Sequence, residues 1–183
     1  MDYKTLISPA DLHTHLDDPA WVIVDCRFWL DDTQKGRRDF QNSHIPRAIY
    51  AHLDEDLSGP VVAGETGRHP LPPVDIFAER LGSWGIDNDV QVVVYDDRGG
   101  AIAARLWWML KWMGHGAVAV LDGGWPAWLR EDYPVTNEIF VPQIRKFEPN
   151  LRSELVVTAE KLLENFGDPS FRLIDSRDPE RFT

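Results

Sequence analysis

The chain has 183 residues, of which 43% are hydrophobic and 27% are charged, which is ordinary for a soluble globular protein. This length suits one domain with a substantial core, or one domain followed by part of another. The formal net charge of −11 excludes the basic surface that nucleic acid or an anionic membrane would require. The single cysteine, Cys26, excludes an internal disulfide and a cysteine-rich metal site. No apolar run approaches membrane-spanning length and the first residues lack a signal core, so a cytoplasmic protein is expected.

Predicted helices and strands alternate along most of the chain. The unbroken apolar run at residues 21–25 is typical of a strand that is covered on both faces. In chain order, we predict a helix capped by Ser8, strands at 21–25 and 48–52, a helix at 74–83, a strand at 90–95, a helix ended by Gly114, a strand at 117–121 and a short helix with Pro126 in its first turn. This alternation predicts an α/β domain with a mainly parallel central sheet and helices on both faces.

The opening of the chain is repeated near its end. The segment from Ser8 to Arg27 aligns without a gap with the segment from Thr158 to Arg177, and both place Asp-x-Arg directly after an apolar run. The second copy therefore predicts a capped helix followed by a strand at residues 171–174. The predicted division is a first domain at 1–135, a connection at 136–155 and the truncated beginning of a second domain at 156–183.

The loop after the predicted strand at 90–95 is the most informative candidate for a functional site. In open α/β sheets, ligands bind at the carboxyl ends of the strands. The loop Asp96-Asp97-Arg98-Gly99-Gly100 leads into a helix, so successive backbone amides there form a cradle for negative charge. Because the loop starts with two carboxylates, these side chains could satisfy the amides and leave no room for a substrate anion.

Six motifs follow one another along the chain. They are VIVDCR, SHIPRAIYAHLD, GRHPLP, VVVYD, ARLWWMLKWMGH and VAVLDGGWPAW. Their content and order resemble the rhodanese family of sulfurtransferases in its tandem two-domain form, over essentially the whole chain. In the second motif, Ser43 and Arg47 replace the usual glycines of the family's G-H-I-P-G-A segment.

The resemblance implies a ping-pong reaction on a cysteine, with no cofactor and no metal. The cysteine takes sulfane sulfur from thiosulfate or 3-mercaptopyruvate as a persulfide and passes it to a thiophilic acceptor such as cyanide. The implied partners are therefore a small-molecule donor and acceptor. In tandem members only the second domain carries this cysteine, on the loop after its central strand. Asp96 occupies that place here, so we expect this chain to lack the nucleophile and to be inactive by itself.

Three further residues fall at positions that the resemblance marks. Arg181 would bind the anionic group of the donor, for which a guanidinium is well suited, with a solvated surface arginine as the alternative. Asp54 and His69 match an aspartate and a histidine that support a serine of the second domain in mercaptopyruvate-type members. The Gly-Arg-His-Pro sequence around His69 resembles the thiosulfate-type members instead, so the donor stays open.

Cys26 is not expected to replace the missing nucleophile. It follows a buried strand, and its counterpart in the second copy is Ser176, so a small buried residue is the favoured interpretation. Its neighbours Asp25 and Arg27 are expected to pair at the end of the strand. The alternative function is a complete, non-catalytic rhodanese-like module that binds a protein or an anion. The incomplete second copy also allows the chain to associate with itself.

Overall fold

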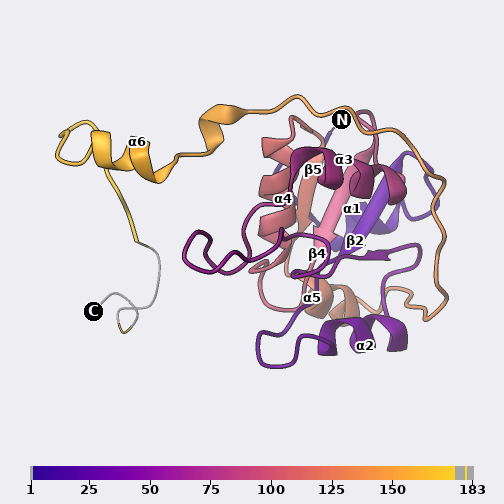
Figure 1. The fold of residues 1–183 in the computed structure, drawn as a ribbon. Helices are drawn as coiled ribbons and strands as arrows, with labels where there is room; N and C mark the ends of the chain where they lie inside the picture. Colours follow the sequence, from indigo (N-terminus) through magenta and orange to yellow (C-terminus); the bar gives the residue numbers. More distant parts are fainter. Residues whose placement is uncertain (1, 176–179, 181–183) are drawn as a thin grey trace. The chain divides into compact units, whose positions relative to one another are not determined.

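The computed structural model describes residues 2–175 and residue 180. The chain divides into two compact units, Met1–Leu151 and Arg152–Thr183. The first unit contains a five-stranded sheet in the order β1-β5-β4-β2-β3, and every neighbouring pair is parallel (Figure 1). Its elements, in chain order, are β1 (Leu6–Ile7), α1 (Pro9–His13), β2 (Trp21–Asp25), α2 (Lys35–Asn42), β3 (Ile49–Tyr50), α3 (Val74–Ser83), β4 (Gln91–Tyr95), α4 (Ala103–Trp112), β5 (Val118–Leu121) and α5 (Gly124–Arg130).

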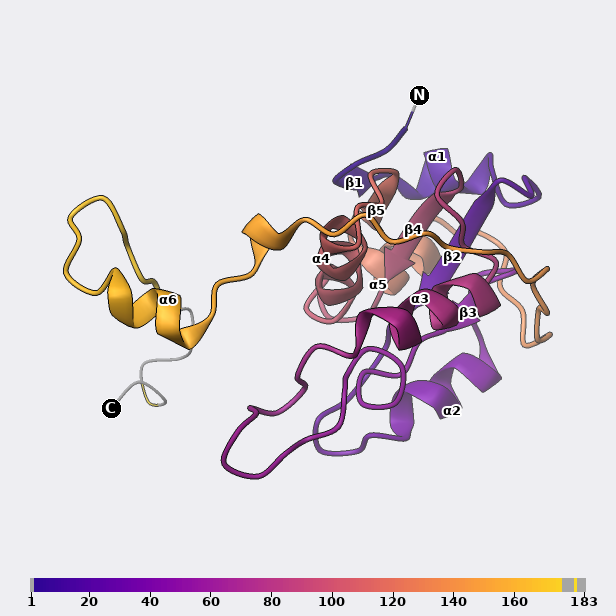
Figure 2. The same ribbon diagram turned by 45° about the horizontal axis from the view of Figure 1, so that its top comes forward.

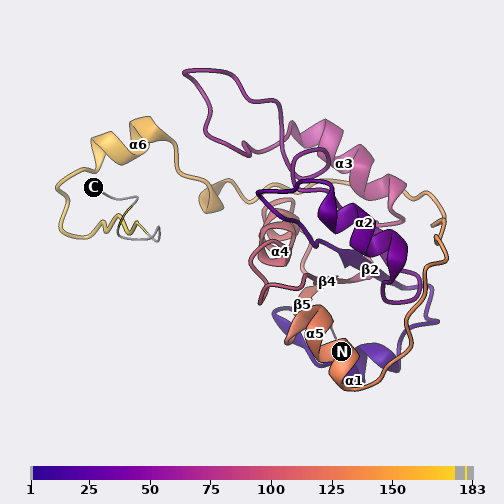
Figure 3. The ribbon, with the colours of Figure 1, turned by 90° about the horizontal axis from the view of Figure 1, so that it is seen from below.

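The two central strands, β2 and β4, are built from apolar runs rich in valine. Every residue of β4 is buried, and β2 pairs with it in register from Trp21 opposite Gln91 to Asp25 opposite Tyr95. β-Branched side chains favour strands, and an unbroken apolar run suits a strand with helices on both sides. Figure 3 shows this layering, with α1 and α5 on one side of the strands and α3 and α4 on the other. The predicted fold class is confirmed.

A hydrophobic cluster covers each face of the sheet. One cluster contains Leu81 of α3 and Leu106 of α4, both fully buried. The other contains Leu12 of α1, Phe40 of α2 and Trp128 of α5. Because each cluster fixes the helices against the strands, the loops at the carboxyl ends of the strands start from a rigid base.

The segment after α5, which we call the strap (residues 137–150), packs along the outside of the first unit (Figure 2). The backbone N–H of Arg145 donates to the carbonyl of Gly82 in α3 at 3.0 Å, and Phe147 is buried in the cluster that contains α3 and α4. A Cβ atom at Gly82 would lie only 2.5 Å from the carbonyl oxygen of Arg145, so glycine is what allows this close approach. Much of the predicted connection between the copies is therefore packed onto the first unit.

The second unit contains a 3-10 helix, Ser153–Leu155, and the helix α6, Ala159–Glu164. Thr158 caps α6 as predicted, because its side chain accepts the backbone N–H of Lys161. The prediction of a strand at residues 171–174 is wrong: these residues form no strand, and their leucine and isoleucine side chains are mostly exposed. A strand requires a neighbour to pair with, and none of the described residues provides one.

Candidate active-site face

The carboxylate of Asp96 fills the amide cradle at the carboxyl end of β4. It is 1% exposed and accepts four backbone N–H groups at 2.8–2.9 Å, those of Arg98, Gly100, Ile102 and Ala103. Gly99 and Gly100 both have positive φ values, 69° and 89°, which turn the chain so that the amides point inward. Of the two carboxylates that could satisfy these amides, Asp96 does so, and the negative charge in the cradle therefore belongs to the chain itself.

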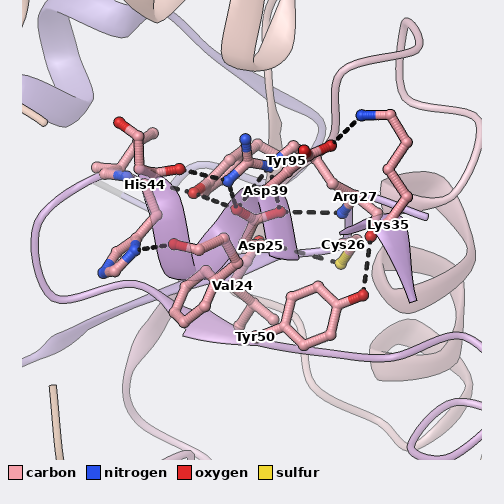
Figure 4. A network of polar contacts seen from close by, with 12 residues as sticks. Val24, Asp25, Cys26, Arg27, Lys35, Asp39, His44, Tyr50 and Tyr95 are labelled. Carbon is pink, nitrogen blue, oxygen red and sulfur yellow. Dashed lines mark hydrogen bonds and ion pairs between the residues drawn. The ribbon is translucent and has the colours of Figure 1, made fainter. Parts of the chain in front are cut away.

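Asp25 and Arg27 pair at the end of β2, as predicted, within a buried network (Figure 4). An Arg27 guanidinium nitrogen lies 2.7 Å from Asp25 Oδ2, which also accepts the hydroxyl of Tyr95 at 2.8 Å. Arg27 donates further to the carbonyl of Ser43 at 2.7 Å. Asp25 is fully buried and Arg27 is 3% exposed, so this network joins the ends of β2 and β4 and offers little to a ligand. The contribution of Tyr95 was not predicted, because nothing in the sequence pairs it with a residue so distant in the chain.

Cys26 lies inside the first unit, directly after β2. Its side chain is completely buried, and its thiol contacts the carbonyl of Val24 at 4.0 Å (Figure 4). Burial, together with the charges of Asp25 and Asp96, raises the pKa of the Cys26 thiol well above its usual value. Since the thiolate is the nucleophilic form, this environment opposes both the ionisation of Cys26 and its access to a sulfur donor.

Asp54 and His69 are brought together on the loop between β3 and α3, which projects from the first unit (Figure 2). The Nε2 atom of His69 lies 2.8 Å from Oδ1 of Asp54. Burial lowers the pKa of His69 below its usual value, and the Asp54 carboxylate opposes this by favouring the imidazolium. The side chain of Asp54 is 41% exposed and that of His69 is 17% exposed, so solvent reaches the pair mainly at the carboxylate.

An arginine that sequence reasoning missed holds this loop in place. Arg105 of α4 donates to the carbonyl oxygens of Leu57 at 2.7 Å and His69 at 2.9 Å. His69 itself has a positive φ of 60°, a conformation that non-glycine residues adopt only where their surroundings fix it. The available signal was an arginine near the start of a helix whose only other charged residue is Lys111, which suggests a buried polar partner.

A cavity of about 210 Å³ opens beside the pair. Its wall combines the apolar side chains of Phe28, Leu30 and Val61 with the polar side chains of Asp54, Arg68 and His69. Asp96 does not line this cavity, and its four hydrogen bonds are to its own loop and the start of α4. Arg181, the remaining predicted site residue, lies outside the described residues.

Neither a metal cluster nor a membrane-spanning element is found in the part of the chain that the structure describes. No three His, Cys, Asp or Glu side chains there are grouped so that they could hold a metal ion. None of the helices there has the length and apolar composition needed to cross a bilayer.

The fold and the loop together define an α/β domain with an anion cradle at the carboxyl end of its central strand. The family model of the rhodanese-like domain matches residues 8–131, and the chain therefore belongs to the rhodanese family. The resemblance of the six motifs to the rhodanese family is confirmed, and the tandem two-domain form stays a prediction.

Its relatives are sulfurtransferases. A probable 3-mercaptopyruvate sulfurtransferase of Pseudomonas aeruginosa is 40% identical over the whole of this chain, which covers 64% of that protein. A thiosulfate sulfurtransferase of Rattus norvegicus is 36% identical over 98% of the chain and 61% of its own length. The crystal structure of a 3-mercaptopyruvate sulfotransferase from Escherichia coli has a TM-score of 0.85 at 29% identity, over 98% of this chain and 68% of that one. The chain thus spans about three fifths of the length of the curated relatives it matches.

Proposed function

We propose that this chain acts in a sulfurtransferase that moves sulfane sulfur from thiosulfate or 3-mercaptopyruvate to a thiophilic acceptor such as cyanide. Within it, residues 1–135 are the domain without the nucleophile, 136–155 connect the copies, and 156–183 begin a second rhodanese-like domain. The names of the relatives support the reaction class. The internal repeat and the matching side-chain caps of α1 and α6 support the second copy.

The observation that carries the proposal is the Asp96 carboxylate in the amide cradle. A persulfide-forming enzyme needs a thiolate that is stabilised by loop amides and a helix N-terminus. Here the same kind of loop surrounds a carboxylate, with four N–H groups already donated to it. A carboxylate cannot accept a sulfane sulfur. This loop therefore has the amide cradle of an active loop but lacks the nucleophile.

The reaction would then use a cysteine other than Cys26. Its thiolate attacks the outer sulfur of thiosulfate, the S–S bond of the donor breaks, and sulfite leaves with the bonding electron pair. Cyanide next attacks the outer sulfur of the persulfide, which releases thiocyanate and restores the thiolate. Cys26 is unsuited to the first step, because it is fully buried and its pKa is raised.

The first domain would contribute polar groups and shape to the donor site. His69 and Asp54 already form a pair beside an open cavity, and the pair would position a group of the second domain. We further propose that Arg181 holds the anionic end of the donor through paired hydrogen bonds.

Turnover by the chain itself tests this assignment. Thiocyanate formation from thiosulfate and cyanide, and pyruvate release from 3-mercaptopyruvate, should both stay at the level of the protein-free control. Cys26→Ser serves as the matched variant and should behave in the same way. Turnover by the wild type that disappears in Cys26→Ser would show that Cys26 is the nucleophile and would overturn the proposal.

A further inference from the structure

A second cavity lies between the body of the first unit and the strap, at the amino ends of the strands. Its volume is about 190 Å³, and its wall includes Trp21 at the start of β2, Trp84 after α3, and Phe140 of the strap. Arg47 and Arg145 also line it. The candidate site described above occupies the carboxyl ends of the strands instead, so this cavity is not part of it.

The backbone of Arg47 has a conformation that is unfavourable for a residue with a side chain. Its φ of 64° is in the left-handed region, where glycine is favoured because a Cβ atom crowds the backbone. Its Nη1 donates to the carbonyl of Leu16 at 3.0 Å, and its guanidinium lies 5.0 Å from the ring centre of Phe140. Within the described residues it forms no ion pair. A positive charge that no carboxylate compensates thus lines the cavity of a chain with a net charge of −11.

The rest of the wall is fixed before any ligand arrives. The guanidinium of Arg145 donates hydrogen bonds to Oδ2 of Asp87 at 2.8 Å and to the carbonyl of Pro19 at 3.0 Å. Trp84 is 6% exposed. Trp21 stacks on His15, with the ring centres 4.0 Å apart and the planes at 8°. A preformed wall lowers the entropy lost on binding.

We propose that this cavity binds a small carboxylate with a flat apolar body. The free N–H groups of Arg47 can take both oxygens of a carboxylate, which is the geometry that guanidinium groups favour. The aromatic side chains provide surfaces on which a flat body can stack. The volume admits a small molecule and is below the range usual for drug-sized ligands. The competing explanation is that Arg47 only fastens the strap, through Leu16 and Phe140.

Benzoate is a suitable probe, with neutral benzamide as its matched control. The indole N–H signals of Trp21 and Trp84, assigned through Trp→Phe variants, should shift on titration with benzoate, with a dissociation constant on the order of 1 mM. The indole of Trp107, which bonds to backbone carbonyls away from the cavity, should not shift. Benzamide should bind about tenfold more weakly, since it lacks the charge.

Arg47→Gly separates binding from folding. Glycine accepts the left-handed backbone, so this variant should stay folded while benzoate binds at least about tenfold more weakly. Arg152→Gly removes an exposed arginine that is not among the residues lining the cavity and should bind benzoate as the wild type does. If benzoate leaves the two indoles unmoved, or binds Arg47→Gly as tightly as the wild type, Arg47 serves only to fasten the strap and the proposed site is wrong.

Discussion

Asp96→Ala removes the carboxylate that holds the loop after β4. This residue is 1% exposed and accepts four backbone N–H groups at 2.8–2.9 Å. Hydrogen bonds to a charged group contribute about 1.5–3 kcal/mol each, but water entering the vacated space will satisfy some of the amides. Folding of the variant also no longer desolvates a carboxylate. Loss of a helix cap alone costs about 0.5–2 kcal/mol. The loss should therefore exceed the cost of a single helix cap and stay well below the full value of four charged hydrogen bonds. We expect the free energy of unfolding to fall by about 3 kcal/mol.

Urea unfolding followed by tryptophan fluorescence measures this change, since the chain has eight tryptophans. Asp97→Ala is the matched control one residue further along. The Oδ1 atom of Asp97 is buried without a hydrogen-bond partner in the described part of the chain, so removal of this side chain should not lower the free energy of unfolding. If Asp96→Ala loses no more stability than Asp97→Ala, the carboxylate of Asp96 does not hold the cradle.

Three further predictions concern the pair on the projecting loop, the strap and the donor site. Asp54→Asn should lower the pKa of His69 further, because the Asp54 carboxylate favours the imidazolium that burial disfavours; an NMR titration in which the pKa stays or rises would contradict the pairing. Gly82→Ala should destabilise the chain by about 1–2 kcal/mol in urea unfolding, because its Cβ would meet the carbonyl of Arg145, although alanine is the better helix former by about 1 kcal/mol. A gain in stability would show that the strap can move away from the new Cβ atom at little cost. In a protein that carries both domains, Arg181→Ala should raise the barrier measured by kcat/KM for the donor by about 2–4 kcal/mol, and Arg181→Lys by less. An unchanged kcat/KM in Arg181→Ala would show that Arg181 does not bind the donor.

The central strands could be predicted from sequence because their burial leaves a direct signal. A short unbroken run rich in valine, such as that of β4, is typical of a strand covered on both faces. The same approach missed β1 (Leu6–Ile7), because a two-residue edge strand has no pattern and Leu6 is 56% exposed. It also missed α2 (Lys35–Asn42), where Phe40 is the only large buried side chain on a mostly polar helix. The strand expected at residues 171–174 shows the opposite error, since an apolar run forms a strand only beside a partner.

The candidate site was predictable where the interaction is local in sequence. Asp96 and the amides that donate to it belong to one loop and the start of the next helix, so the sequence could offer internal satisfaction of the cradle as an expectation. The approach of Asp54 to His69 was expected only through the family resemblance, because a loop of this length does not fix their distance. The support from Arg105 to this loop depends on tertiary packing between α4 and residues far from it in the chain.

We have proposed that sulfur is carried by a cysteine other than Cys26. The most direct measurement is the mass of the Cys26 peptide after the folded chain has been incubated with thiosulfate, the donor removed and the thiols alkylated under denaturing conditions. We predict an alkylated thiol without added sulfur, because Cys26 is fully buried and its pKa is raised. A mass increase of one sulfur atom on Cys26, together with thiocyanate formation that stops in Cys26→Ser, would contradict the account.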